Sequence, residues 1–241
     1  MAKSGPRSGK PRGEQSAEVR AALVSAAIDA LAETGYAGAS AREIAGRAGC
    51  SQALVFYHFG SVNDLLLAAL DEVSSRRMTA YRGLLTDATS ATALATAARR
   101  ILTADLDAGY VRVLVEMITA SHAVPGLGDQ VAERLQPWRE LTEQAVRNAL
   151  GRSAAARLLP PADAARALVA GFLGLELLAS LDNDRAAALA LLDRAGSLAR
   201  LLDMLGSLRL LGQGGTVRPG ATPYPDGPEP PAKPVGGREG R

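Results

Sequence analysis

Cysteine and histidine are scarce in this sequence. It has one cysteine, Cys50, and two histidines, His58 and His122, among 241 residues. A single cysteine excludes an intramolecular disulfide framework and is typical of a reducing compartment. The histidine–carboxylate spacings of metalloenzymes, a glycine-rich phosphate loop and a Ser/His/Asp set are missing as well. The sequence therefore predicts no metal and no cofactor, and it disfavours an enzyme.

A strong net charge and long apolar runs are also missing. The net charge is +2, so any nucleic-acid binding must use a local basic patch. The N-terminus lacks the apolar core of a signal peptide. The most apolar run, 167–181, is interrupted by Glu176 and is shorter than the roughly 20 residues that a spanning helix needs. We therefore expect a cytoplasmic protein with no membrane partner.

Apolar residues recur at helical spacing along most of the chain, and no stretch alternates as a strand does. The predicted fold is all-α, with about nine helices. We expect a helix-turn-helix domain at 16–62 and a larger helical domain at 63–211. The flanking segments, 1–15 and 212–241, are rich in Gly and Pro and should be disordered. The basic N-terminal segment is either a solvated tail or an arm that touches DNA.

The stretch 40–65 has the local signals of two short helices joined by a tight turn. Ser40 and Glu43 have the spacing of a capping box, and Ser61 and Asp64 repeat it at the next helix. Gly49 stands where a helix ends in the left-handed conformation. Two such helices joined by a glycine-containing turn predict a helix-turn-helix.

The same stretch resembles the TetR family of transcriptional regulators. The resemblance rests on the Ala-Gly-Cys-Ser run at 48–51, the Phe-Tyr-His-Phe block at 56–59, the Gly35–Tyr36 turn and Ser61. It covers roughly residues 16–70. It implies a homodimer that binds double-stranded DNA through the N-terminal helices and an unknown small-molecule effector through the C-terminal ones. It implies, by default, a repressor that the effector releases from a palindromic operator.

The residues expected to contact DNA lie on or beside the second helix of the motif: Ser40, Arg42, Ser51, Gln52, Ala53, Phe56, Tyr57, His58 and Ser61. Gln52 can pair bidentately with adenine, and Ala53 can contact a thymine methyl. Arg47 is a further candidate for a phosphate. His58 is otherwise a surface or packing residue. Val55, Phe59 and Cys50 are expected to be structural.

Two positions depart from the family pattern. Phe56 stands where the family often has a tyrosine, so a hydroxyl contact is lost. Val62 stands where a lysine is common, just after the Ser61 cap. The missing lysine should reduce the salt dependence of DNA binding by about one counterion.

Two long helices near the C-terminus, 163–181 and 184–210, are apolar on more than one side. A helix apolar all round must be covered all round, which favours a second copy of the chain. We expect a two-fold dimer through a four-helix bundle. The interface candidates are Leu168, Phe172, Leu175, Ala179, Leu198, Leu202 and Leu205.

Polar and large residues within apolar helices mark a candidate effector pocket: Arg112, Glu116, Met117, His122, Trp138, Phe172 and Glu176. Four of them have other interpretations. Arg112 and Glu116 are spaced as an i,i+4 ion pair, and Trp138 can be a core residue. Glu176 can instead pair across the dimer with an arginine.

Three functions fit these patterns. The first is a ligand-responsive DNA-binding repressor. The second is an all-α enzyme that uses the same pocket, and the third is a dimeric small-molecule-binding protein without DNA activity. The helix-turn-helix favours the first.

Overall fold

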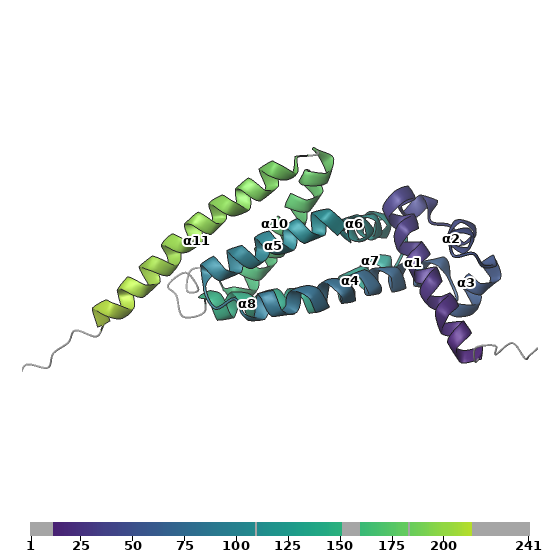
Figure 1. Ribbon diagram of the computed structural model, residues 1–241, viewed down its shortest axis with the longest axis horizontal. Helices are drawn as coiled ribbons and strands as arrows, with labels where there is room; N and C mark the ends of the chain where they lie inside the picture. The colour runs from purple at the N-terminus through teal and green to yellow at the C-terminus, as the bar shows by residue number, and fades with distance from the viewer. Residues whose placement is uncertain (1–11, 109, 151–159, 183, 214–241) are drawn as a thin grey trace, which may run out of the picture.

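A computed structural model describes residues 12–108, 110–150, 160–182 and 184–213 of the chain, with side chains described up to Leu205. These residues form helices and connecting turns, without a strand among them, as predicted (Figure 1). The helices are α1 (Arg12–Gly38), α2 (Ala41–Arg47), α3 (Gln52–Phe59), α4 (Val62–Thr86), α5 (Ala91–Ala108), α6 (Tyr110–Ser121), α7 (Leu127–Arg134), α8 (Gln136–Leu150), α10 (Pro161–Leu181) and α11 (Arg185–Gln213).

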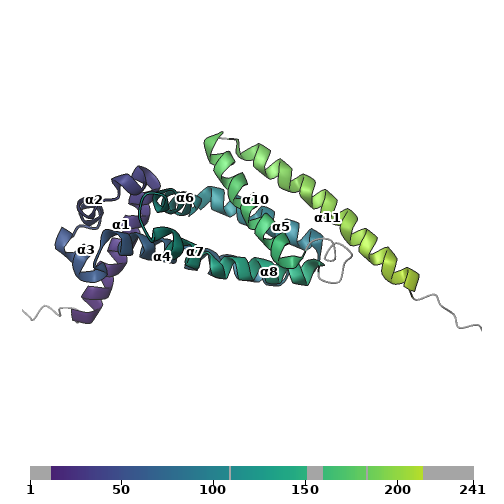
Figure 2. The ribbon, with the colours of Figure 1, turned by 180° about the vertical axis from the view of Figure 1, so that it is seen from behind.

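Helices α1, α2 and α3 pack together at one end of an elongated molecule, and both views of the ribbon show them there (Figures 1 and 2). Their shared core includes Leu23, Ile44 and Val55, which are fully buried. Helix α4 begins in this cluster and runs the length of the second domain. The helix-turn-helix is therefore fixed to the larger domain through α4.

Helix α1 is longer than its apolar pattern indicates. It begins at Arg12, inside the segment predicted to be a disordered tail, and it passes through a break at Gly35 before ending at Gly38. Gly35 has φ 70° and ψ −179°, a conformation that only glycine adopts readily. The rest of the two predicted tails, residues 1–11 and 214–241, lies outside the described residues. Residues 212 and 213 of the predicted C-terminal tail belong to the end of α11.

The turn between α2 and α3 follows the prediction closely. Gly49 has φ +66°. The Gly49 N–H donates to the Gly46 carbonyl, and the Cys50 N–H donates to the Ala45 carbonyl. These two bonds close the end of α2 as a Schellman motif, which needs a left-handed residue between them. The turn thus orients α3 by backbone geometry alone.

The two predicted capping boxes form only in part. The Ser40 Oγ accepts from the Glu43 N–H at 3.2 Å, but the Glu43 carboxylate turns away to an arginine. The Ser61 Oγ accepts from the Asp64 N–H and donates to the Asp64 carboxylate at 2.6 Å. Each serine caps its helix, and each acid finds a partner other than the serine N–H.

The second domain departs from prediction at helix boundaries. The stretch 127–150 forms two helices, α7 and α8, which meet at Leu135, just before the first turn of α8 that carries Pro137. Helix α10 begins at Pro161 itself, where proline costs no hydrogen bond, rather than after it. The Asp184 carboxylate accepts from the Ala187 N–H at 2.9 Å and so caps α11.

Helix α10 has 21 residues and is apolar enough, by length and composition, to cross a membrane. The expectation that this run is too short was wrong, because the helix extends upstream of residue 167. Within this chain only 22% of its most apolar stretch is buried. Helix α10 packs against α8 and α5, while α11 lies along α5 and reaches the end opposite to α1 (Figures 1 and 2).

Candidate DNA-reading surface and effector cavity

The outer face of α3 presents the side chains predicted to read DNA. Gln52 and Ala53 are exposed, Phe56 is 47% exposed, and Tyr57 is 79% exposed. Val55, on the opposite face, is fully buried, as predicted. Exposed aromatic rings cost free energy in water, and these two are the only large apolar side chains that the described residues of α1 to α8 leave so exposed. This exposed face of α3 is therefore a candidate contact surface.

The N-terminus of α3 has free hydrogen-bonding capacity. Ser51 has the extended backbone of an N-cap, but its hydroxyl makes no capping bond. The first N–H groups of a helix carry a partial positive charge and attract phosphate. The unused Ser51 hydroxyl adds a donor at the same place.

The aromatic block of α3 is held by edge contacts. The His58 ring stands edge-on to Tyr57 at 5.0 Å and to Phe59 at 6.4 Å. The Arg20 guanidinium lies 4.8 Å from the centre of the Phe59 ring, which fixes α1 against α3. Phe59 is partly buried in the core as expected, and His58 is half-buried. His58 thus has a packing role beside any contact with DNA.

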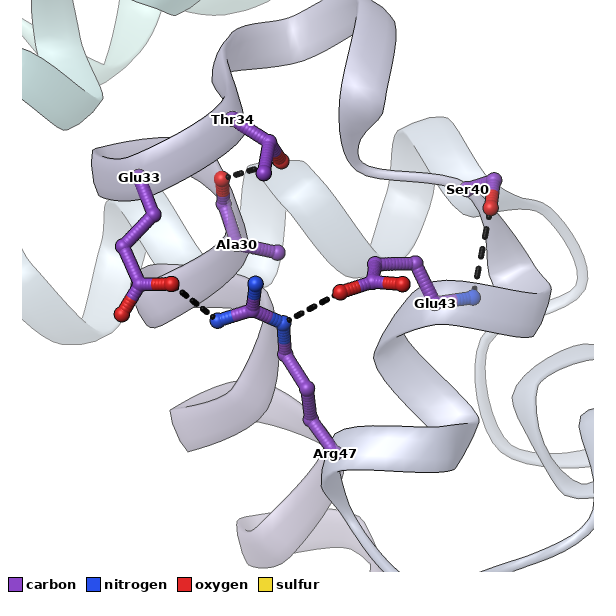
Figure 3. A network of polar contacts seen from close by, with 6 residues as sticks. All are labelled: Ala30, Glu33, Thr34, Ser40, Glu43 and Arg47. Atoms are coloured by element: carbon purple, nitrogen blue, oxygen red, sulfur yellow. Dashed lines mark hydrogen bonds and ion pairs between the residues drawn. The ribbon is translucent and has the colours of Figure 1, made fainter.

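Arg47 is engaged within the protein. Its Nε donates to Glu43 and its Nη1 donates to Glu33, each at 2.8 Å (Figure 3). These bonds tie α2 to α1 and raise the pKa of Arg47. The prediction of Arg47 as a phosphate contact is corrected, because two carboxylates already neutralise it. Arg42 is exposed on the same helix and carries no such pair.

The second domain contains a partly open cavity of about 630 Å³, lined by residues of α4 to α8, α10 and α11. Its volume lies within the range of small-molecule sites. Two predicted pocket residues, Trp138 and Phe172, line it. Its polar lining consists of Ser74, Arg77, Tyr110, Arg134, Trp138 and Thr142. The remaining lining residues are apolar.

Four other predicted pocket residues lie elsewhere. Arg112 is exposed, and His122 lies on the surface after α6. Met117 is fully buried in the core that α6 shares with α1. Glu116 accepts a hydrogen bond from the Tyr36 N–H at 2.9 Å, at the break in α1. Because Glu116 points to the DNA-binding end, it does not line the cavity, and among the described residues it forms no ion pair with Arg112.

Glu176 belongs to a buried cluster beside the cavity. It is 1% exposed and lies 3.6 Å from the Arg77 Nη2. Arg77 also binds both oxygens of Asp105, and the Tyr81 hydroxyl donates to Asp105 at 2.9 Å. The predicted cross-dimer partner is therefore replaced by an arginine of the same chain.

Burial raises the pKa of Glu176 to about 9, since Arg77 offsets only part of the desolvation and the Asp105 carboxylate raises it further. Both Glu176 oxygens lack a donor. A protonated Glu176 can instead donate to Asp105, which satisfies the pair at neutral pH. The cluster then holds one positive and one negative charge. It joins α4, α5 and α10 next to the cavity.

Sequence reasoning missed Arg77 and Asp105. A signal was present, because Arg77 follows Leu70 and Val73 and precedes Tyr81 on the buried stripe of α4. A charged residue on a buried stripe indicates a buried partner. Its partner lies on α5 and could not be identified from the stripe alone.

The predicted dimer residues divide into two groups. Leu168, Leu198, Leu202 and Leu205 are exposed on α10 and α11, with Leu198 at 60%. Ala179 is buried against Leu102 within the same chain, which corrects its assignment to an interface. Phe172 and Leu175 are partly buried in the same way. The exposed set continues along both helices through Leu177, Leu178, Leu181, Leu191, Leu201 and Met204.

The structure thus joins a helix-turn-helix with an exposed outer face to an all-helical domain that holds a cavity. Residues 23–69 match the family described as bacterial regulatory proteins, tetR family. Among curated proteins, the HTH-type transcriptional repressor Rv3405c of Mycobacterium tuberculosis is 44% identical over 59 residues, 24% of this chain and 31% of the relative. The chain thus matches about a third of that relative's length.

Solved structures extend the likeness to the second domain. A TetR-family member from Streptomyces coelicolor is 28% identical with a TM-score of 0.57, covering 74% of this chain and 98% of its own. The transcriptional regulator FadR from Bacillus subtilis, in complex with stearoyl-CoA, is 13% identical with a TM-score of 0.61, covering 74% and 96%. The second match shows the fold alone. The N-terminal domain of this chain thus matches the tetR family, and its fold is similar to that of a solved member.

Proposed function

We propose that the protein is a homodimeric transcriptional repressor that binds a palindromic operator and is released by a small-molecule effector. The observation that carries the proposal is the outer face of α3. Gln52, Phe56 and Tyr57 are exposed there, on a helix whose opposite face packs into the core. A helix in this arrangement can enter the major groove with its N-terminal residues against base edges. The curated relative named above is a repressor.

The effector part of the proposal rests on the cavity. Its wall includes Leu70, Val73, Ser74 and Arg77 of α4, the helix that begins in the DNA-binding end. A ligand that favours one position of α4 shifts the population toward it, provided that its affinity differs between the two states. The Bacillus subtilis neighbour was solved with stearoyl-CoA, so the same fold can hold a ligand with a long apolar chain.

The dimer part rests on the exposed leucines of α10 and α11. Large apolar patches on a soluble protein mark interaction sites. A two-fold symmetric contact between these helices would cover the exposed leucines of both copies. It would also present two α3 helices to two half-sites. We place the protein in the cytoplasm, as a DNA-binding protein without catalytic activity. In this proposal, α10 lies in the dimer interface and not in a membrane.

Replacing Leu198 by aspartate should convert the dimer to a monomer at micromolar concentration. Leu198 is 60% exposed in the single chain, so the substitution costs little there. At a two-fold interface it would bury two unpaired charges, which costs several kcal/mol. Sedimentation velocity measures the mass. Phe56→Asp is the control, at an apolar residue of α3 that is 47% exposed, and should remain dimeric. A dimeric Leu198→Asp protein would place the interface elsewhere.

Replacing Gln52 by alanine should weaken binding to the operator by about 1–3 kcal/mol and relax the preference at one base pair. The reason is the loss of a bidentate contact to a base edge. Binding to a set of operator variants, measured by fluorescence anisotropy at fixed salt, checks this. A loss of equal size on every sequence would instead place Gln52 on a phosphate.

The proposal as a whole is tested by gel shift with DNA next to the coding sequence. A specific complex at moderate salt is the expected result. The absence of a complex even at low salt would favour the alternative, a dimeric small-molecule-binding protein without DNA activity. An all-α enzyme is the remaining alternative, and turnover of a bound ligand would reveal it.

A further inference from the structure

The cavity wall offers hydrogen-bond donors and no acid. Among the described residues that line it, the polar ones are two arginines, a serine, a threonine, a tyrosine and a tryptophan. An amine or other cation in this cavity would meet no carboxylate on the wall. Since a buried charge without a partner costs several kcal/mol, the lining disfavours a cationic ligand.

The two arginines are already neutralised. Arg134 forms an ion pair with Asp71, with Nε 2.8 Å from Oδ1, and its Nη2 donates a hydrogen bond to Oδ2 at 3.2 Å. Arg77 binds Asp105 through Nε and Nη2. Both acids lie behind the wall and do not line the cavity. A carboxylate or phosphate on the ligand would therefore add an unbalanced negative charge, which disfavours an anionic ligand as well.

Arg77 keeps one donor for a ligand. It is 8% exposed, and its Nη1 takes part in no hydrogen bond found among the described residues. Its guanidinium is fixed from one side by Asp105 and from the other by the Trp138 ring, 5.1 Å from the guanidinium carbon. Trp138 is fixed in turn by the bond from its Nε1 to the Ser74 Oγ at 2.8 Å. The donor is held in place before a ligand arrives.

We propose that the effector is an uncharged, mostly apolar molecule with a carbonyl-type oxygen, such as a ketone, ester, lactone or amide, which accepts a hydrogen bond from Arg77. This inference rests on the proposed effector cavity and names the class of its ligand. The acceptor uses the free donor without adding a charge. The apolar body fills the part of the cavity that leucines of α10 and α11 line.

Binding of matched alkyl probes tests the class. Trp138 is the only tryptophan of the chain and lies on the cavity wall, so its fluorescence reports occupancy directly. The probes are 2-undecanone, decanoate and decylamine, each titrated into the full-length protein without DNA. We expect 2-undecanone to bind at least about tenfold more tightly than either charged probe. Equal or tighter binding of decanoate or decylamine, or no saturable binding of 2-undecanone, overturns the proposal.

A charge-balanced variant tests the role of Arg77. Arg77→Met together with Asp105→Asn removes both charges, so neither partner is left buried and unpaired. It should weaken 2-undecanone binding by about tenfold or more, whereas Arg76→Met, which breaks only a surface pair with Glu72, should not. Unchanged binding in the double variant overturns the assignment, and the probe ranking in the wild type stands as a separate test if that variant misfolds. Operator binding without probe, measured on the same preparation, reports on the proposed function independently.

Discussion

Replacing Gly35 by alanine should lower the free energy of unfolding by about 2–4 kcal/mol. Gly35 has φ 70° and ψ −179°, where a side chain is strained whatever the space around it. A Cβ would also lie 2.7 Å from Oε2 of Glu116. The Glu116 carboxylate would have to move and would lose its bond from the Tyr36 N–H. Urea denaturation at fixed protein concentration measures the change.

Gly83→Ala is the matched control, because Gly83 lies exposed within α4 and a Cβ there meets no atom within 4 Å. Alanine is favoured over glycine inside a helix, so this change should raise stability by about 0.5–1 kcal/mol. The two substitutions should thus move stability in opposite directions. A Gly35→Ala protein as stable as the wild type would mean that α1 and α6 do not meet through Glu116.

Replacing Glu176 by glutamine should raise the melting temperature at pH 8.5 by about 5–10 °C, and should change it little at pH 5. The folded state keeps a proton on Glu176 up to its pKa of about 9, whereas the unfolded chain releases it near the ordinary value of 4.5. Between these values the unfolded state binds fewer protons, so stability falls as pH rises. Glutamine does not titrate, and its amide can donate to Asp105 as the protonated acid does.

Differential scanning calorimetry at a series of pH values and one protein concentration checks this, since a dimer melts at a temperature that depends on concentration. Glu133→Gln on the exposed side of α7 is the control and should follow the wild type at every pH. If the difference in melting temperature between Glu176→Gln and the wild type does not grow with pH, this contradicts a raised pKa at Glu176.

Local signals predicted the DNA-binding end of this chain well. The turn at Gly49 and the caps at Ser40 and Ser61 depend on neighbours within a few residues, so the sequence alone contains them. The break at Gly35 was predicted for the same reason, although its partner Glu116 lies 80 positions away and was misplaced. Proximity across that distance depends on how α1 and α6 pack.

The second domain shows where sequence reasoning ends. Glu176 was singled out as a polar residue within an apolar helix, but its partners Arg77 and Asp105 come from two other helices. Trp138 was assigned to the pocket and does line it, while His122 was assigned there and lies on the surface. Residue type alone does not indicate which face of a helix is directed into the helix bundle.

Helix α4 reaches from the Ser61 cap to Thr86 and has 25 residues. At 1.5 Å per residue it is a rod about 37 Å long, with the cavity wall along its middle and the helix-turn-helix at its first turn. If a helix of that length tilts by about 5° around its far end, its first turn moves by about 3 Å. In the proposed dimer, small adjustments around the proposed effector would therefore change the spacing of the two α3 helices by a larger distance.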